Sequence, residues 1–131
     1  MKNKFVCPRC QGVLNPNVKI LLIADMGKAK GLVLLSPQPG NYKYLCDSSL
    51  EKHLHPGETI TFYCPLCHAD LTSASDDSLT ALELHVGSHP VRRVEFSRVF
   101  GTHATFIISE GEVDTYGEDA GDYDPLNFFG A

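Results

Sequence analysis

Two short cysteine pairs constrain the fold of this chain more than any other feature. Segments 7–10 and 64–67 read Cys-Pro-Arg-Cys and Cys-Pro-Leu-Cys. A spacing of two residues lets one tight turn direct both sulfur atoms at a single ion, and proline stiffens that turn. Two such turns supply the four thiolates of a closed tetrahedral site, which is typical of structural zinc. The sequence therefore predicts one zinc ion, and its ligands are Cys7, Cys10, Cys64 and Cys67.

The residues around the two pairs also match each other. Each pair follows a short stretch that contains aromatic residues, and a leucine comes four residues after each pair. These flanking residues are Phe5 and Leu14 for the first pair, and Phe62 and Leu71 for the second. In these features, residues 5–14 and 62–71 resemble the zinc-ribbon class, in which two Cys-x-x-Cys knuckles on β-hairpins share one zinc ion. The resemblance implies a structural metal site and indicates no particular family within the class.

The chain departs from the ribbon pattern directly after the second cysteine of each pair. Ribbon knuckles often have glycine there, whereas this chain has Gln11 and His68, with Gly12 one residue late. The two halves of the site are also far apart, so residues 11–63 must place a β-subdomain between them. Closing a long loop costs little extra entropy compared with a metal-binding free energy of roughly 10–16 kcal/mol.

The same four cysteines have three other possible uses. Iron fits the same tetrahedral cage, as in rubredoxin-like electron carriers. Two disulfides would require an oxidising compartment, but the N-terminus lacks the apolar region of a secretory signal, and we expect a cytoplasmic protein with reduced thiols. The odd number of cysteines, five, also argues against a complete disulfide framework. A thioredoxin-like redox pair requires a βαβ context, which the flanking residues do not offer.

Hydrophobic patterning predicts a mainly β fold with antiparallel strands. Aliphatic runs within residues 18–45 predict a hairpin, inserted between the two knuckles. Residues 79–116 alternate apolar and polar side chains between tight turns, which predicts a meander covered on one face. In this meander we expect Phe96 and Phe106 to face the core and Arg93 to lie on the opposite face. Apart from the cysteine pairs, the sequence shows no internal repeat.

Composition divides the chain into a domain and a tail. We expect residues 1–116 to form the zinc-binding β domain, and residues 117–131 to form a mobile acidic tail that has no Lys or Arg. The apolar end of the tail, residues 126–129, would dock on its own domain, on a second copy or on a partner, and we favour docking on a protein. The net charge of -5 does not suit a protein that grips phosphate backbones. No apolar run reaches the roughly 18 residues of a membrane-spanning helix.

Few other residues suggest a role in metal binding, thiol reactivity or nucleic-acid binding. We interpret Cys46 as a small buried hydrophobe, with metal ligation beside a histidine or a reactive thiol as alternatives. His68 is expected to face solvent. The cluster of Arg92, Arg93 and Arg98 could form a nucleic-acid face, although charge compensation is the simpler interpretation. The remaining histidines, expected at the surface or at strand edges, are His53, His55, His85, His89 and His103.

Common catalytic signatures are missing from the sequence. It contains no His-Glu-x-x-His motif, no phosphate-binding glycine loop and no Gly-x-Ser-x-Gly elbow. No histidine has glutamate two residues later, as a zinc deaminase requires. We therefore predict a non-catalytic zinc protein that acts as an adaptor or accessory module for a protein partner, or that self-associates. The alternatives are a nucleic-acid-binding zinc ribbon and a rubredoxin-like electron carrier.

Overall fold

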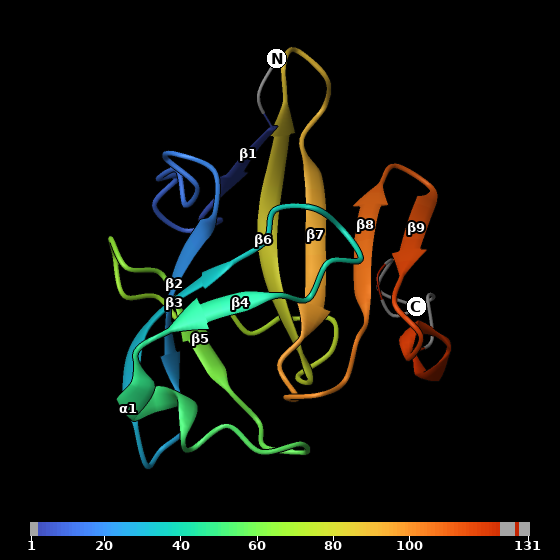
Figure 1. Cartoon of the computed structure of the whole chain (residues 1–131). Coiled ribbons are helices and arrows are strands. Elements are labelled where there is room, and N and C mark those ends of the chain that lie inside the picture. Colours follow the sequence, from blue (N-terminus) through green and yellow to red (C-terminus); the bar gives the residue numbers. More distant parts are fainter. Residues whose placement is uncertain (1–2, 124–127, 129–131) are drawn as a thin grey trace.

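A computed structural model describes residues 3–123 and residue 128, and its strands dominate as predicted (Figure 1). The strands are β1 (Asn3–Val6), β2 (Ile20–Asp25), β3 (Lys30–Leu35), β4 (Tyr44–Cys46), β5 (Thr61–Tyr63), β6 (Leu79–Val86), β7 (Arg92–Ser97), β8 (Thr105–Ser109) and β9 (Glu112–Tyr116). The helices are α1 (Ser48–Glu51) and the 3-10 helix η1 (Ala120–Asp122). The side chain of Asp47 caps α1 by accepting the N–H of Ser49.

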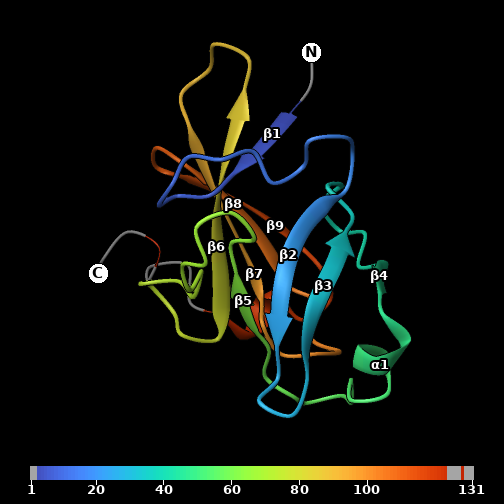
Figure 2. The same cartoon turned by 90° about the vertical axis from the view of Figure 1, so that its left-hand side faces the viewer.

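The strands form two antiparallel sheets that pack against each other (Figure 2). The five-stranded sheet has the order β1-β6-β7-β8-β9, and the four-stranded sheet has the order β4-β3-β2-β5. The hairpin predicted within residues 18–45 is β2 and β3, extended by β4. The meander predicted for residues 79–116 is β6 to β9. The expectation of a mainly β, antiparallel fold is therefore confirmed.

The main core lies between the two sheets. In β2 every second residue is buried, so that Leu22 faces Val94 and the other inward residues of the five-stranded sheet. The ring of Phe62 in β5 meets that of Phe96 in β7 edge to face, with centroids 5.6 Å apart. This arrangement is favourable for two aromatic rings beyond the area they bury.

Both sheets have the same internal order, which reveals a repeat in the fold. Strands β1 to β4 correspond in sequence order to β5 to β8, and β9 is an addition at one edge. The first strand of each half joins the sheet of the other half, because β1 pairs with β6 and β5 pairs with β2. The register repeats as well: Phe5 lies opposite Leu84, and its counterpart Phe62 lies opposite Ala24. The two halves are thus interlocked by exchange of their first strands.

The outer face of the five-stranded sheet carries a second, smaller core, which corrects the prediction for the meander. Phe106 lies opposite Glu95 in the strand register, so both side chains are on the outer face, whereas Phe96 faces the main core. The prediction that Phe96 and Phe106 share a face is therefore wrong. Strand β8 is buried at four consecutive positions, Thr105 to Ile108, so its sequence does not show which alternate side chains face the main core. Phe128, which is 4 % exposed, packs on Phe106 with ring centroids 4.8 Å apart.

The described residues near the C-terminus are attached to the domain, so the expected mobile acidic tail is not confirmed. The carboxylate of Asp119 accepts the backbone N–H of His103 at 2.9 Å, and the N–H of Asp119 donates to the carbonyl of His103 at 3.0 Å. Arg93 donates to the carbonyl of Phe128 at 2.6 Å and to the carboxylate of Glu95 at 2.7 Å. The remaining residues of the predicted docking segment, 126, 127 and 129, lie outside the described residues.

Candidate metal centre

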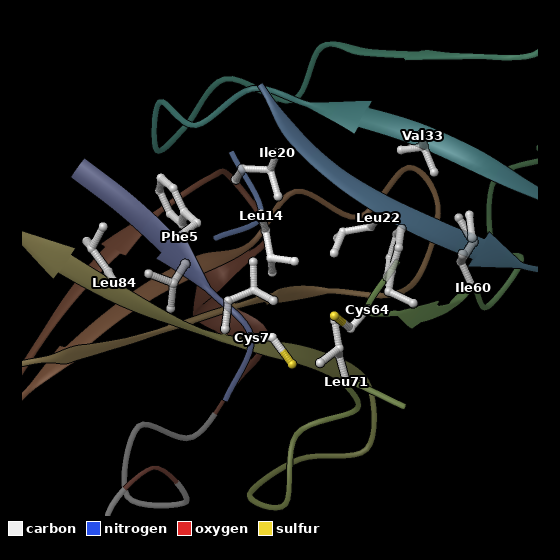
Figure 3. Close-up of a cluster of buried hydrophobic side chains, with 14 of the residues drawn as sticks. Phe5, Cys7, Leu14, Ile20, Leu22, Val33, Ile60, Cys64, Leu71 and Leu84 are labelled. Atoms are coloured by element: carbon white, nitrogen blue, oxygen red, sulfur yellow. The ribbon is translucent and has the colours of Figure 1, made fainter. Parts of the chain in front are cut away.

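The four predicted cysteines meet where the two sheets adjoin. Strand β1 runs directly into Cys7 and β5 directly into Cys64, and these are edge strands of different sheets. Both cysteines are 0 % exposed and belong to the main core, and their side chains approach each other at its border (Figure 3). Cys10 and Cys67 complete the cluster from the solvent side. A metal ion bound here connects one sheet to the other.

The sulfur atoms have the spacing that a tetrahedral ion requires. The Sγ atoms of Cys7 and Cys67 are 3.8 Å apart, as are those of Cys10 and Cys64. All four sulfur atoms lie within 4.8 Å of one another. Zinc–sulfur bonds of about 2.3 Å at tetrahedral angles place the sulfur atoms about 3.8 Å apart. The four cysteines are therefore arranged to bind one metal ion, and this geometry is compatible with zinc.

Backbone N–H groups surround the buried sulfur atoms in the same way in both pairs. The N–H groups of Arg9 and Cys10 lie 3.3 Å and 3.5 Å from the Sγ of Cys7. The corresponding N–H groups of the second pair reach the Sγ of Cys64 at the same two distances. The N–H of Gly12 also donates to the Sγ of Cys10, at 3.4 Å. Such donors stabilise the thiolate form, which is the form that binds metal.

Burial and hydrogen bonding act on these thiols in opposite directions. Burial raises the pKa of the Cys7 thiol to about 12. A hydrogen bond from the backbone N–H of Ala69 lowers the pKa of the exposed Cys67 thiol. A coordinated cation deprotonates a thiol outright and replaces the lost hydration of the buried thiolate. Cys7 therefore needs a bound cation to remain a thiolate at neutral pH.

Gln11 and His68 adopt the left-handed backbone conformation that glycine takes up most readily. Their φ angles are 63° and 65°, and within residues 3–123 and 128 they are the only non-glycine residues with positive φ. Each N–H bonds back to the carbonyl of the first cysteine of its pair, at 2.9 Å in both knuckles. The departure from the ribbon pattern therefore changes the residue type and leaves the knuckle geometry intact, at a cost of about 1 kcal/mol for each left-handed residue.

The other candidate ligands lie apart from this cluster. Cys46 is half-buried at the end of β4, where its Sγ is 3.4 Å from a carboxylate oxygen of Glu51. His68 is exposed, as expected. His85 and His103 pair with neighbouring glutamates at 3.0 Å and 2.8 Å. Among the described residues, no histidine belongs to a group of metal-ligating side chains.

Two of the three arginines that could have formed a nucleic-acid face are hydrogen-bonded within the domain. Arg98 donates to the carbonyl of Ile60 at 3.0 Å and to the hydroxyl of Thr61 at 2.8 Å, which ties the end of β7 to β5 in the other sheet. Arg93 binds Glu95 and the C-terminal segment, as described above. Two of the three clustered arginines therefore stabilise the fold, which the sequence pattern did not indicate.

A second surface feature, which was not predicted, is an apolar outer face on the four-stranded sheet. The leucines that alternate with the core residues of β2 and β3 point away from the main core, and no described element lies in front of these strands (Figure 2). Leu32 and Leu45 are 54 % and 57 % exposed. We call this surface the leucine face, and its residues are Leu21, Ile23, Leu32, Leu34 and Leu45. This face could have been predicted from the sequence, because the apolar runs of β2 and β3 are unbroken and therefore place apolar side chains on both sides of the sheet.

Comparison with known proteins gives no relative from which a function could be transferred. No protein-family model matches the chain, and neither a curated protein nor a solved structure matches it. Within the described part of the chain, no helix is long and apolar enough to cross a membrane. Function must therefore be inferred from the cysteine site and the surfaces around it.

Proposed function

We propose that this chain is a non-catalytic zinc protein, in which the ion staples the two sheets and the leucine face binds a protein partner. Four cysteine ligands fill the coordination sphere of a tetrahedral zinc ion and leave no position for water or substrate. A site of this kind contributes free energy of folding and supplies no reactive group. The knuckles would hold the ion through Cys7 and Cys10 from one half, and Cys64 and Cys67 from the other.

The partner-binding role rests on one observation, the contrast between the outer faces of the two sheets. Leu45 in β4 and Phe106 in β8 occupy equivalent places in the two halves of the chain. Leu45 lies opposite Leu34 of β3, and Phe106 lies opposite Glu95 of β7, the strand that is equivalent to β3. On the five-stranded sheet, Phe128 of the same chain covers Phe106. On the four-stranded sheet, the equivalent Leu45 is 57 % exposed. A contiguous apolar surface of this kind on a folded domain marks an interaction site.

The same contrast indicates what kind of partner would fit. The covering segment on the five-stranded sheet contributes an aromatic ring and a backbone carbonyl, which Arg93 binds. The leucine face has the apolar contact, and Lys30, which shares this side of β3, lies over the ring of Tyr63 with its Nζ 5.6 Å from the centroid. We therefore infer a protein partner that supplies an apolar segment and its own polar rim. A nucleic acid fits this surface poorly, because leucine and isoleucine dominate it, whereas phosphate contacts need several Lys or Arg side chains.

Photo-crosslinking from the leucine face tests this proposal. A photoreactive residue at position 32 or 45 should crosslink one and the same protein in the cells that express the chain, whereas position 115 on β9 should not. The substitution Leu45→Glu should abolish the crosslink from position 32, and the matched surface change Thr115→Glu should leave it intact. Crosslinking to no protein, or equal crosslinking from position 115, would refute the role of this face. A dimer by light scattering that Leu45→Glu dissociates would identify the partner as a second copy.

Elemental analysis of the purified protein tests the zinc assignment separately. We expect one zinc ion per chain. A red protein that contains iron and has a one-electron couple would instead support the electron-carrier alternative.

A further inference from the structure

A cavity of about 210 Å³ lies between the two sheets, and none of the four clustered cysteines lines it. Its walls are inward-facing side chains of both sheets, together with the connections that follow β3 and β7. The β3–β4 connection, residues 36–43, crosses β7 towards β8 (Figure 1). There the hydroxyl of Tyr42 lies 3.0 Å from the hydroxyl of Thr105, and its ring stacks on His103 at 4.4 Å. The connection is thus fastened over the cavity.

Aromatic and aliphatic side chains dominate the wall of this cavity. Two edge-to-face pairs contribute to it, Phe62 with Phe96 at 5.6 Å and Tyr44 with Phe100 at 5.7 Å between centroids. Edges and faces of such rings are favourable partners for a further aromatic ring. An engineered apolar cavity of about 150 Å³ in another protein stays dry and binds benzene. A cavity of about 210 Å³ therefore has room for a flat molecule somewhat larger than benzene.

Two polar groups of the wall, the guanidinium of Arg98 and the hydroxyl of Thr105, are already paired, and Lys43, which also belongs to the lining, is exposed to solvent. The guanidinium of Arg98 donates to Ile60, Thr61 and Asp77. The hydroxyl of Thr105 pairs with Tyr42. A charged ligand would lose its hydration in this cavity without gaining a free counter-charge from either group, whereas an uncharged aromatic ligand has little hydration to lose.

We propose that this inter-sheet cavity is a binding site for a small, uncharged aromatic molecule of about the size of indole. The ligand would contact Phe62, Phe96 and Phe100 and would lie beneath the β3–β4 connection. This site is independent of the metal centre and of the leucine face, because neither the clustered cysteines nor the leucines that define that face line it.

Calorimetric titration of the metal-loaded protein with indole tests this proposal. We expect saturable binding at one site per chain, with amide shifts confined to residues that line the cavity. Val33 faces the cavity and its neighbour Leu32 faces outward on the same strand, so Val33→Phe and Leu32→Phe form a matched pair. Val33→Phe should weaken indole binding at least tenfold, and Leu32→Phe should leave it unchanged.

Three results would overturn the proposal. The first is no saturable binding of indole to the natural protein, and the second is equal binding to the Val33→Phe variant. The third is equally tight binding of benzoate, a charged aromatic of similar size, since the cavity should reject it. If Val33→Phe fails to fold, Ala24→Val, a smaller change at another lining residue, replaces it with the same expected direction.

Discussion

Leu14 and Leu71 make the same pair of backbone hydrogen bonds in the two halves of the chain. Each donates its N–H to the phenylalanine carbonyl of the preceding strand, at 2.7 Å for Leu14 and 2.9 Å for Leu71. Each then accepts, at 2.8 Å, an N–H from a strand of the other sheet, that of Leu21 or Ala81. The segment after each knuckle therefore joins the two sheets beside the metal centre. A bound ion and these two leucines hold the same junction.

Loss of a buried ligand should therefore lower the stability of the protein. Cys7→Ser should remove the metal ion and lower the free energy of unfolding by several kcal/mol, because metal binding to ligands from distant segments is coupled to folding. Cys46→Ser, at a cysteine outside the cluster, should retain one ion per chain. Metal content and denaturant unfolding check both variants. Full metal content with unchanged stability in Cys7→Ser would refute the four-cysteine site.

Replacement of His68 by glycine should stabilise the protein. His68 has a φ of 65° and is exposed, so glycine removes backbone strain without loss of packing. We expect His68→Gly to raise the free energy of unfolding by about 0.5–1 kcal/mol. His68→Val should lower it, because a β-branched residue fits the left-handed region poorly. Thermal unfolding of the metal-loaded variants checks this, and a destabilised His68→Gly protein would contradict the knuckle geometry.

Replacement of Arg93 should lower the free energy of unfolding considerably, although the sequence pattern assigns this residue to a solvated face. Arg93 pairs with Glu95, which is 1 % exposed, so Arg93→Ala leaves a buried carboxylate without its partner. We expect a loss of about 3 kcal/mol in the free energy of unfolding. Arg92→Ala, at the neighbouring position, should cost under about 0.5 kcal/mol. Equal effects of the two substitutions in urea unfolding would show that the outer face is not a core.

The local features of this fold could be predicted from sequence, and the features that depend on register could not. The knuckle spacing encodes the metal site, because two residues between cysteines fix the geometry within each pair. Whether Phe106 faces inward depends on how β8 aligns with β7, and alternation within a strand does not determine that. The repeat was hidden for a similar reason. The equivalent residues Leu84 and Ala24 share an inward orientation without sharing an identity.

Cys46 should react slowly with alkylating reagents at neutral pH. Burial, followed by the hydrogen bond to Glu51, raises the pKa of its thiol to about 11. The thiolate fraction, and with it the alkylation rate, should therefore increase about tenfold per pH unit between pH 7 and pH 10. Glu51→Gln should lower the pKa and speed the reaction at pH 8, whereas Glu112→Gln on β9 should not. Mass spectrometry after iodoacetamide treatment gives the rates. Rapid alkylation at pH 7 would contradict this assignment.

Removal of the metal ion should loosen the junction between the sheets before it disturbs the meander. The cysteines follow the edge strands β1 and β5, whereas β7 lies inside the five-stranded sheet and is paired on both sides. After treatment with a chelator, backbone amide exchange should accelerate first in residues 5–14 and 62–71, including the N–H groups of Leu14 and Leu71. The amides of β7 should remain protected for longer, because their partners belong to the same sheet. Exchange that accelerates equally in β7 and in the knuckles would show that the ion maintains the whole domain and not the junction alone.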